Sequence, residues 1–493
     1  MTFNSINFLI FFPIVVLIYY IFPRKLRYIW LLISSYYFYL NWDIKFALFL
    51  LPVTFMTYGT GVLLEWANAK GFSSHGLLKK LLILFGVCFT MGTLGVLKYT
   101  DFFILNLNKI VSAWGMQIKT PRWNLVLPIG ISFYSFQALG YLIDIYRKKE
   151  HAEKNILRVA LFLSFFPVIM SGPIERAGNL LKQLQGEVRL KVENIRYGLL
   201  SLAWGIFLKV VIADNLAGVV NNVIKNWQEQ QGCEIAFATI LFGIQIYCDF
   251  NGYSQMASGT ARVLGIDIIK NFSAPYLAEN IKDFWRRWHI SLTSWFTDYL
   301  YIPLGGNRKG TVRKYINTLV VFGISGLWHG ASLNFVVWGM LNGFYLIVYD
   351  GYRRIKRKSG NNIPGTSGNR IGKSLLTFGA FDFTLLFFMM PDMGNALGAL
   401  RHMMSHFHGS RFFSEGFWEG FFSTRQLMIL MIALLVVWVV DCLEYEGKDF
   451  RKVLFEQRKP IRWAVYLFLV FMVIIWGTYG GEYEQTGFIY FDF

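Results

Sequence analysis

Long apolar segments separated by short polar stretches run along nearly the whole chain. A helix that crosses a membrane needs about 20 mostly apolar residues. Candidate segments lie at 6–22, 28–40, 44–64, 79–97, 129–145, 156–171, 197–213, 235–250, 315–327, 332–349, 374–390, 427–442 and 463–479. Several are short or broken by Gly and Pro, which requires neighbouring protein or water to satisfy the freed backbone groups. The pattern predicts an all-α polytopic membrane protein with about eleven transmembrane helices plus re-entrant or interfacial helices.

Basic residues gather in the loops between these apolar segments. The clusters lie at 24–27, 79–80, 147–149, 353–358 and 448–462. They fall on one side of the membrane if the N-terminus is outside and the early spans alternate. Because cytoplasmic loops carry an excess of Lys and Arg, we expect these loops to be cytoplasmic.

Composition excludes two broad classes of protein. Of the 493 residues, 55% are hydrophobic and only 16% are charged. This is too few charged residues to cover the surface of a soluble protein of this length. Disordered chains show low hydrophobicity, the opposite of this composition. The net charge of +18 raises the question of nucleic-acid binding, but the excess basic residues lie in short clusters between apolar stretches. We therefore expect a lipid membrane as the partner and no nucleic acid.

One segment, 271–310, breaks the membrane pattern by mixing aromatic and charged residues. An amphipathic helix on the membrane surface would place Trp285 and Trp288 at the headgroups, while Arg286 and Arg287 reach phosphates. From composition alone, this surface helix is the favoured interpretation.

A second segment places His329 between two apolar stretches, beside Gly323, Gly326 and Gly330. An ionisable group at membrane depth is costly and usually marks a pathway or a reaction centre. A neutral imidazole can take a proton from a hydroxyl that attacks a thioester or ester. The residues leave two interpretations equally open: a reaction centre, or a hairpin turn with a satisfied interfacial histidine. Neither a Gly-x-Ser-x-Gly elbow nor a phosphate-binding P-loop is visible, which argues against serine chemistry and an ATP-driven pump.

Polar side chains also recur on one predicted helix. They are spaced by about three to four residues, at Gln245, Asp249, Asn251 and Ser254. Such a face indicates either a wet channel or a hydrogen-bond network between helices. Lys209 and Asp214 are candidates for an intramembrane ion pair, although snorkelling of Lys209 to an interface is the simpler explanation.

His402, His406 and His408 superficially resemble a metal site. The nearest carboxylates are Asp392 and Glu415, and the stretch is rich in Ser and Phe, so we expect no metal there. Six aromatic residues follow, at Phe412, Phe413, Phe417, Trp418, Phe421 and Phe422. An aromatic loop outside the membrane is better explained as a surface on which a partner docks.

Several longer stretches together resemble a known family. They are LPIGISFYSFQALGYLIDIYR (127–147), FFPVIMSGPIER (165–176), GIFLKVVIADNLA (205–217), QIYCDFNGYSQMASG (245–259), FWRRWHISLTSWFTDYLYIPLGGNRKG (284–310), WHGASLNFVVWG (328–339) and FIYFDF (488–493). Their order and spacing are similar to the membrane-bound O-acyltransferase family, in the branch of the alginate O-acetyltransferase membrane subunit. The resemblance implies one membrane acyltransferase domain over 1–493, with N-terminal spans in 1–124, a motif-bearing core in 125–350 and C-terminal spans in 351–493.

The resemblance also implies a function. A central funnel would carry an acetyl group from a cytoplasmic donor, acetyl-CoA, towards O-acetylation of an extracellular or cell-wall polysaccharide, with no cofactor besides that donor. An extracytoplasmic acetyltransferase or esterase-like partner would receive the acetyl group, and the protein would lie in the bacterial cytoplasmic membrane.

The family's invariant histidine falls on His329 and its second histidine on His289, which makes these two the expected catalytic residues. Donor-binding or channel-lining roles are expected for Arg286, Arg287, Asp298, Asp249, Asn251 and Trp328. Arg308 and Lys309 would lie at the same donor entrance as Arg286 and Arg287.

Two alternatives remain open. One is the sister branch that attaches D-alanine to teichoic acid, and the other is a polysaccharide export channel without catalysis. The chain also departs from the branch pattern at Thr297, Gln255, Asn342 and Met389-Met390. These departures leave the acceptor and the partner open.

Overall fold

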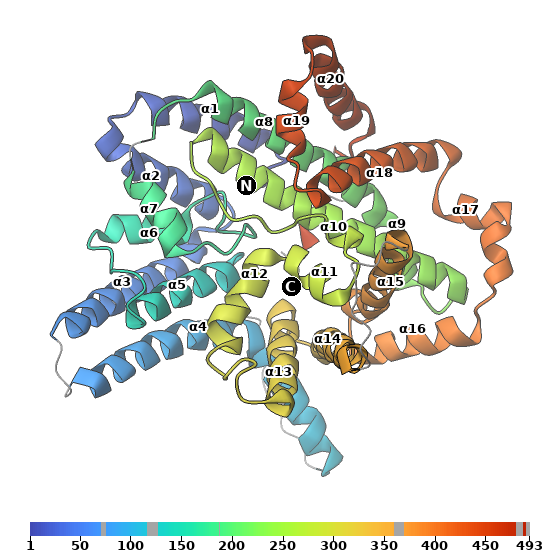
Figure 1. Ribbon diagram of the computed structural model, residues 1–493, viewed down its shortest axis with the longest axis horizontal. Coiled ribbons are helices and arrows are strands. Elements are labelled where there is room, and N and C mark those ends of the chain that lie inside the picture. The colour runs from blue at the N-terminus through green and yellow to red at the C-terminus, as the bar shows by residue number, and fades with distance from the viewer. Residues whose placement is uncertain (71–74, 116–126, 187, 359–368, 480–486, 490–493) are drawn as a thin grey trace. The chain divides into compact units, whose positions relative to one another are not determined.

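The computed structural model describes residues 1–70, 75–115, 127–186, 188–358, 369–479 and 487–489. Its regular elements are helices, and no strand occurs within these ranges (Figure 1). The expected all-α fold is confirmed. The chain forms two compact units, one of Met1–Leu199 with Met256–Ile269 and one of Leu200–Gln255 with Lys270–Phe493. Residues from the predicted core, 125–350, contribute to both units.

The first unit is built from the N-terminal helices. They are α1 (Ile6–Ile21), η1 (Arg24–Leu26), α2 (Arg27–Leu40), η2 (Ile44–Phe46), α3 (Ala47–Ala69), α4 (His75–Ala113), α5 (Ile131–Tyr146), α6 (Ile156–Ser164), α7 (Ala177–Gln185) and the start of α8 (Val192–Ile206). Gly130 begins α5 with a φ of 80°, and a Cβ there would lie 2.1 Å from the carbonyl oxygen of Ile169. Only glycine allows this approach, which brings the start of α5 against the 165–172 segment.

The second unit holds residues 200–206 of α8 and the remaining helices, except that residues 256–263 at the end of α10 belong to the first unit. They are η3 (Phe207–Ala213), α9 (Asp214–Lys225), α10 (Gly232–Val263), η4 (Pro275–Leu277), α11 (Ile281–Arg287), α12 (Ile290–Phe296), η5 (Thr297–Tyr301), α13 (Thr311–His329), α14 (Leu333–Lys358), α15 (Arg370–Met389), α16 (Met393–Ser405), η6 (Gly409–Phe413), α17 (Glu415–Phe421), α18 (Thr424–Tyr445), α19 (Phe450–Glu456) and α20 (Lys459–Trp476). The segments η3 and η5 are π-helical turns, a form found frequently at functional sites.

Several helices are long and apolar enough to cross a membrane. Among the described residues, seven segments meet this condition: Ile44–Ala69, Gly76–Ala113, Val192–Lys225, Gly232–Val263, Arg370–Met389, Thr424–Tyr445 and Lys459–Trp476. The expected multi-pass membrane protein is confirmed. Fewer segments qualify than the eleven expected, in part because the predicted spans at 28–40, 129–145 and 156–171 form helices of 14, 16 and 9 residues. Helices of this length are shorter than the hydrocarbon core, which is about 30 Å thick.

Helices α13 and α14 pack tightly against each other as an antiparallel hairpin in the second unit. A Cβ at Gly326 would lie 2.1 Å from the carbonyl oxygen of Phe335, and one at Gly339 would lie 2.1 Å from that of Phe322. Small residues at such positions let two helix backbones approach closely. The close packing of the hairpin therefore depends on glycine at positions 326 and 339. His329 is the last residue of α13, at the turn of the hairpin.

Candidate active site

His289 lies in the turn between α11 and α12. Its backbone is left-handed, with a φ of 45° and a ψ of 51°, and its side chain is 1% exposed. A left-handed conformation is uncommon for a residue with a Cβ, and such outliers cluster at functional sites. The ring of Phe250 packs edge-on against the imidazole, with the two centroids 4.6 Å apart.

His329 is the last residue of α13 and is also buried. Aromatic rings surround its imidazole: the centroid of Trp338 lies 5.0 Å away and that of Phe388 lies 5.5 Å away. The centroids of the His289 and His329 rings are 6.3 Å apart. The two histidines expected to be catalytic are thus neighbours, although 40 positions separate them in the sequence.

Both histidines line a cavity of about 460 Å³ in the second unit. One face of α13 forms a wall of this cavity, through Lys314, Tyr315, Thr318, Val321, Phe322, Ser325 and His329. These positions recur every three or four residues, as one helix face requires. From Lys314 to His329 the wall is about 22 Å long at the rise of an α-helix. The cavity is therefore elongated, with an imidazole end and an end near Lys314.

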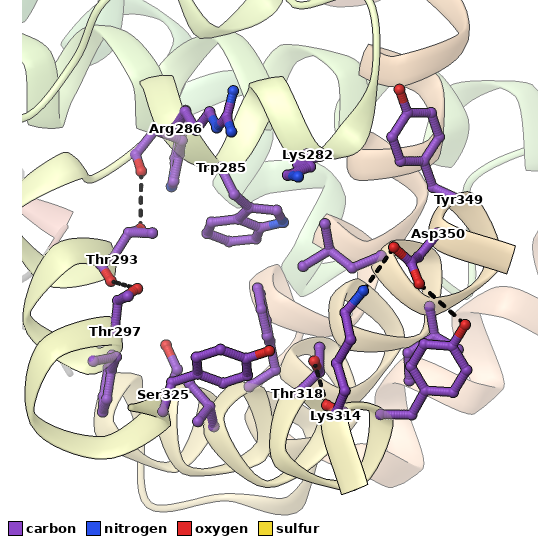
Figure 2. Close-up of a pocket in the computed structure, with 18 of the residues that line it drawn as sticks. Lys282, Trp285, Arg286, Thr293, Thr297, Lys314, Thr318, Ser325, Tyr349 and Asp350 are labelled. Carbon is purple, nitrogen blue, oxygen red and sulfur yellow. Dashed lines mark hydrogen bonds and ion pairs between the residues drawn. The ribbon is translucent and has the colours of Figure 1, made fainter. Parts of the chain in front are cut away.

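Basic residues line the end near Lys314. They come from α11, α13 and α14, at Lys282, Lys314 and Arg353, and Arg286 lines the cavity one turn further along α11. Figure 2 shows Lys282 between Arg286, which lies on the side of Thr293 and Thr297, and the Lys314–Asp350 pair on the other side. Burial, together with the charges of Arg286, Arg353 and Lys314, lowers the pKa of Lys282. These cations line one cavity, and a group of cations around one opening forms a site for an anion.

Asp350 is the acidic residue among those that line the cavity. Its carboxylate binds Lys314 Nζ at 2.6 Å and Arg354 Nε at 2.9 Å, and the hydroxyl of Tyr315 donates to it at 3.1 Å. Burial raises the pKa of Asp350, but the bonds and charges of these partners outweigh it and leave the pKa below its usual value. Asp350 is therefore ionised and neutralises part of the cation cluster.

Three other residues expected at the donor site lie outside the lining of this cavity. Arg287 donates from Nε to Asp283 at 2.9 Å and from Nη1 to the carbonyl of Ser273 at 3.1 Å. Asp298 is half-buried in η5. Trp328 packs beside both imidazoles, at centroid distances of 4.9 Å from His329 and 6.0 Å from His289. Of the two predicted arginines, only Arg286 reaches the cavity wall.

Asp249 belongs to a buried charge cluster with Lys209 and Asp214. Lys209 Nζ lies 2.7 Å from a carboxylate oxygen of Asp249 and 2.8 Å from one of Asp214. Lys209 is 1% exposed, so snorkelling to an interface was the wrong interpretation. The two carboxylates compensate the charge of the buried ammonium group, so the lysine side chain does not have to extend to the membrane surface.

The other polar residues on α10 bond mainly within the protein. Asn251 accepts a hydrogen bond from the side-chain amide of Gln255 at 3.2 Å, and Ser254 accepts one from Asn271 at 3.0 Å. Neither Asp249 nor Asn251 lines the cavity. These contacts favour the hydrogen-bond network over the wet channel, and a channel role for these residues stays a prediction.

The histidines at 402–408 lie apart from the cavity lining. His402 Nε2 is 2.9 Å from the carbonyl oxygen of Gln230, and its ring stacks on His406 with centroids 4.3 Å apart. Within the described residues, no group of three or more His, Cys, Asp or Glu side chains is arranged to hold a metal ion.

Sequence reasoning missed Lys282, Lys314 and Arg353 as wall residues. The basic cluster at 353–358 is typical of a cytoplasmic loop, and Lys314 stands directly before a predicted span at 315–327. A usable signal was present in α13, where Lys314, Thr318, Ser325 and His329 follow one helical face. A polar stripe on an otherwise apolar helix indicates a face turned away from lipid.

The arrangement suits transfer of an acyl group to a hydroxyl, with a histidine to take the proton. Burial lowers the pKa of His289 to about 3, so this imidazole is neutral at pH 7 and a poor proton acceptor. His289 is thereby suited to hydrogen bonding, while His329 is the candidate for the general base. An aromatic enclosure excludes water and strengthens the electrostatic interactions inside it.

An all-helical, membrane-spanning chain with a buried pair of histidines belongs to the polytopic membrane enzymes. A family model for MBOAT, the membrane-bound O-acyltransferase family, matches residues 31–390. The chain belongs to this family and is an O-acyltransferase.

Three relatives illustrate the similarity. Probable alginate O-acetylase AlgI of Pseudomonas aeruginosa is 36% identical over 349 residues, covering 71% of this chain and 66% of the relative, slightly less than two thirds. A peptidoglycan O-acetyltransferase of Helicobacter pylori is 33% identical over 410 residues, covering 78% and 74%. A teichoic acid D-alanyltransferase of Bacillus subtilis is 26% identical over 256 residues, covering 48% and 62%.

Proposed function

We propose that this enzyme takes an acetyl group from acetyl-CoA on the cytoplasmic side of a bacterial cytoplasmic membrane and supplies it for O-acetylation of a polysaccharide outside. The observation that carries this proposal is one elongated cavity with converging cations at one end and two histidines at the other. The names of the alginate and peptidoglycan relatives support acetyl as the acyl group and a polysaccharide as the final acceptor.

The cationic end suits the donor's phosphates. Lys282 and Arg286 lie one helical turn apart on α11 and both line the cavity (Figure 2). Charge-assisted hydrogen bonds to phosphate are among the strongest polar contacts, and arginine matches phosphate geometry with its planar fork. Phosphates held there would leave the thioester arm to extend along α13 towards His329.

The imidazole end suits the transfer itself. His329 takes the proton of an attacking hydroxyl as its oxygen bonds to the thioester carbonyl carbon, the carbon–sulfur bond breaks, and the thiolate receives that proton. His289 hydrogen-bonds to the donor and keeps it in line. A positioned base contributes typically 10²–10⁴-fold to such a reaction.

An extracytoplasmic acetyltransferase or esterase-like partner then receives the acetyl group and delivers it to the polymer. We place its docking surface on the segment between α15 and α18. Exposed aromatic residues there include Phe407 and Phe413, the latter 92% exposed.

The test is the O-acetyl content of the envelope or secreted polysaccharide in cells that carry His329→Ala or His289→Ala as the sole copy. The matched control is His151→Ala, because His151 is an exposed histidine whose partner is Glu65. We expect O-acetyl to fall to background in both cavity variants and to stay normal in the control. Normal O-acetylation in a stably inserted His329→Ala protein would overturn the proposal.

The same experiment separates the alternatives. Mild base releases acetate from O-acetyl esters and D-alanine from teichoic acid esters. Release of D-alanine that depends on His329 would assign the chain to the D-alanylating branch. A loss of secreted polymer, with no change in its acylation, would indicate an export channel.

A further inference from the structure

The backbone at His289 is strained, and the strain needs a structural cause. A left-handed conformation for a residue that carries a Cβ persists only where the surrounding structure enforces it. His289 carries a Cβ, so this conformation costs energy that it would not cost glycine, although histidine adopts it more often than most residues do. The contacts on both sides of the turn therefore identify the residues that enforce it.

Asn271 binds the C-terminal side of the turn through two of its groups. Its backbone carbonyl accepts the N–H of Ile290 at 2.9 Å, and its side-chain oxygen accepts the hydroxyl of Ser291 at 2.6 Å. Asn271 and Ser291 are both fully buried. Ile290 and Ser291 directly follow His289, so these bonds fix the path of the chain as it leaves the histidine.

The remaining group of Asn271 anchors this turn to α10. Its amide nitrogen donates to the hydroxyl oxygen of Ser254 at 3.0 Å. Phe250 lies one helical turn earlier on α10, and its ring packs against the His289 imidazole. One helix thus supports the backbone of the turn through Ser254 and the side chain of the histidine through Phe250.

The N-terminal side of the turn is held by the same short strip of chain. The N–H of Ser273 donates to the carbonyl of Arg287 at 3.1 Å, and the Arg287 guanidinium donates back to the carbonyl of Ser273 at 3.1 Å. Residues 271–273 therefore hydrogen-bond to the chain both before and after His289.

From these contacts we infer that Asn271 is a positioning residue that holds the His289 turn in its left-handed form and so directs the imidazole to the cavity beside His329. The inference rests on the proposed function, because His289 must take part in the transfer for its position to matter. A residue that contacts the substrate keeps its position only if the side chains that hold it are themselves fixed by hydrogen bonds.

The test compares Asn271→Ala with Asn342→Ala in the full-length protein reconstituted in lipid nanodiscs, with acetyl-CoA as the probe. Asn342 is an equally buried asparagine whose amide donates to the carbonyl of Trp338 and the hydroxyl of Thr384, away from the turn. We expect Asn271→Ala to lower kcat about 10- to 100-fold with KM for acetyl-CoA changed less than about twofold. Asn342→Ala should change kcat less than about threefold.

Two further readouts separate positioning from general destabilisation. Hydrogen exchange should rise at residues 288–293 in Asn271→Ala and remain unchanged at residues 335–345. In a His289→Gln background, Asn271→Ala should lower the rate no further, since residues that act as a unit are non-additive.

Equal loss of kcat in both asparagine variants would overturn the inference, as would faster exchange at 288–293 with kcat unchanged. Full activity in His289→Gln would contradict both the proposed function of His289 and the role of Asn271. Full activity in Asn271→Ala beside an inactive His289→Gln would contradict only the latter.

Discussion

Two buried polar clusters in the second unit differ in how their charges are satisfied. In the first, Lys209 binds Asp214 at 2.8 Å and Asp249 at 2.7 Å, and the N–H of Ile489 donates to Asp249 at 2.8 Å. In the second, His289 and His329 lie among aromatic rings around a cavity of about 460 Å³. The charged groups of the first cluster contact one another, whereas the histidines of the second line a cavity that a substrate can enter.

This contrast separates two uses of a buried ionisable group. Such groups are expensive in either case and are functional candidates by default. Where a lysine and two carboxylates contact one another, the charges are satisfied within the protein, and removing one partner is what destabilises the fold. Where imidazoles border an open cavity that leads to a cation cluster, the arrangement indicates chemistry.

The largest effect that we predict is the loss of activity in His329→Gln. Removing a general base lowers kcat by about 10²–10⁴-fold, equivalent to roughly 3–5 kcal/mol in the barrier. The thermal midpoint of the purified protein should stay within a few degrees of the wild type. Acetyl transfer and thermal unfolding measured on the same samples check the prediction. A drop in stability that matched the loss of activity would make His329 a structural residue like Lys209.

Lys209→Met should behave in the opposite way. It leaves the carboxylates of Asp214 and Asp249 buried without their cation, which costs about 3–5 kcal/mol of folding stability. Adding Asp214→Asn and Asp249→Asn should restore part of that loss. Thermal unfolding in detergent gives the measurement.

Lys182→Met is the matched control for this variant, because the Lys182–Glu150 pair lies at the surface with the lysine side chain 65% exposed. Exposed pairs contribute about 1 kcal/mol or less. A Lys209→Met protein as stable as this control would contradict the structural role of the charge cluster.

The same contrast shows what the sequence could reveal. The all-helical fold and the membrane spans follow from apolar length, and His329 stands out because an imidazole between apolar segments is costly. The family resemblance added His289. Neither signal indicates which helix faces meet, so the convergence of Lys282, Lys314 and Arg353 from three helices was not predicted.

Lys209 shows more clearly that a single sequence does not reveal contacts between distant segments. Its depth in an apolar segment was clear, but Asp249 lies 40 positions away on α10. A lysine near a span end commonly snorkels, and a single sequence does not show that a second helix brings a carboxylate within 2.7 Å. Local patterns therefore identify costly residues, while long-range packing decides their use.

At the cationic end of the cavity, we predict an effect on donor binding. Lys282→Gln and Arg286→Gln should each raise KM for acetyl-CoA about tenfold, equivalent to about 1.4 kcal/mol, with kcat nearly unchanged. Lys309→Gln is the control, because Lys309 is exposed and does not line the cavity although the sequence placed it at the donor entrance. Steady-state kinetics over a range of acetyl-CoA concentrations gives both constants. Equal effects in all three variants would indicate general charge attraction in place of a defined phosphate site.

The smallest predicted effect concerns Glu175 in the first unit, a buried carboxylate bound to amides and not to a lysine. The N–H of Ile269 donates to it at 2.5 Å and the side-chain amide of Asn179 at 2.8 Å. Burial raises the pKa of Glu175 from 4.5 to about 7, and these hydrogen bonds oppose the rise only in part.

Because the pKa of Glu175 is higher in the folded state than in the unfolded state, folding favours the protonated form. Its contribution to stability is complete below pH 4.5 and is lost as the pH rises through about 7. The wild type should therefore be more stable at pH 6 than at pH 8 by about 1 kcal/mol from this group. Glu175→Gln, which is neutral at both values, should lack this part of the difference. Thermal midpoints of both proteins at pH 6 and pH 8 test the prediction, and an unchanged difference in Glu175→Gln would show that this carboxylate remains charged inside the fold, as those beside Lys209 do.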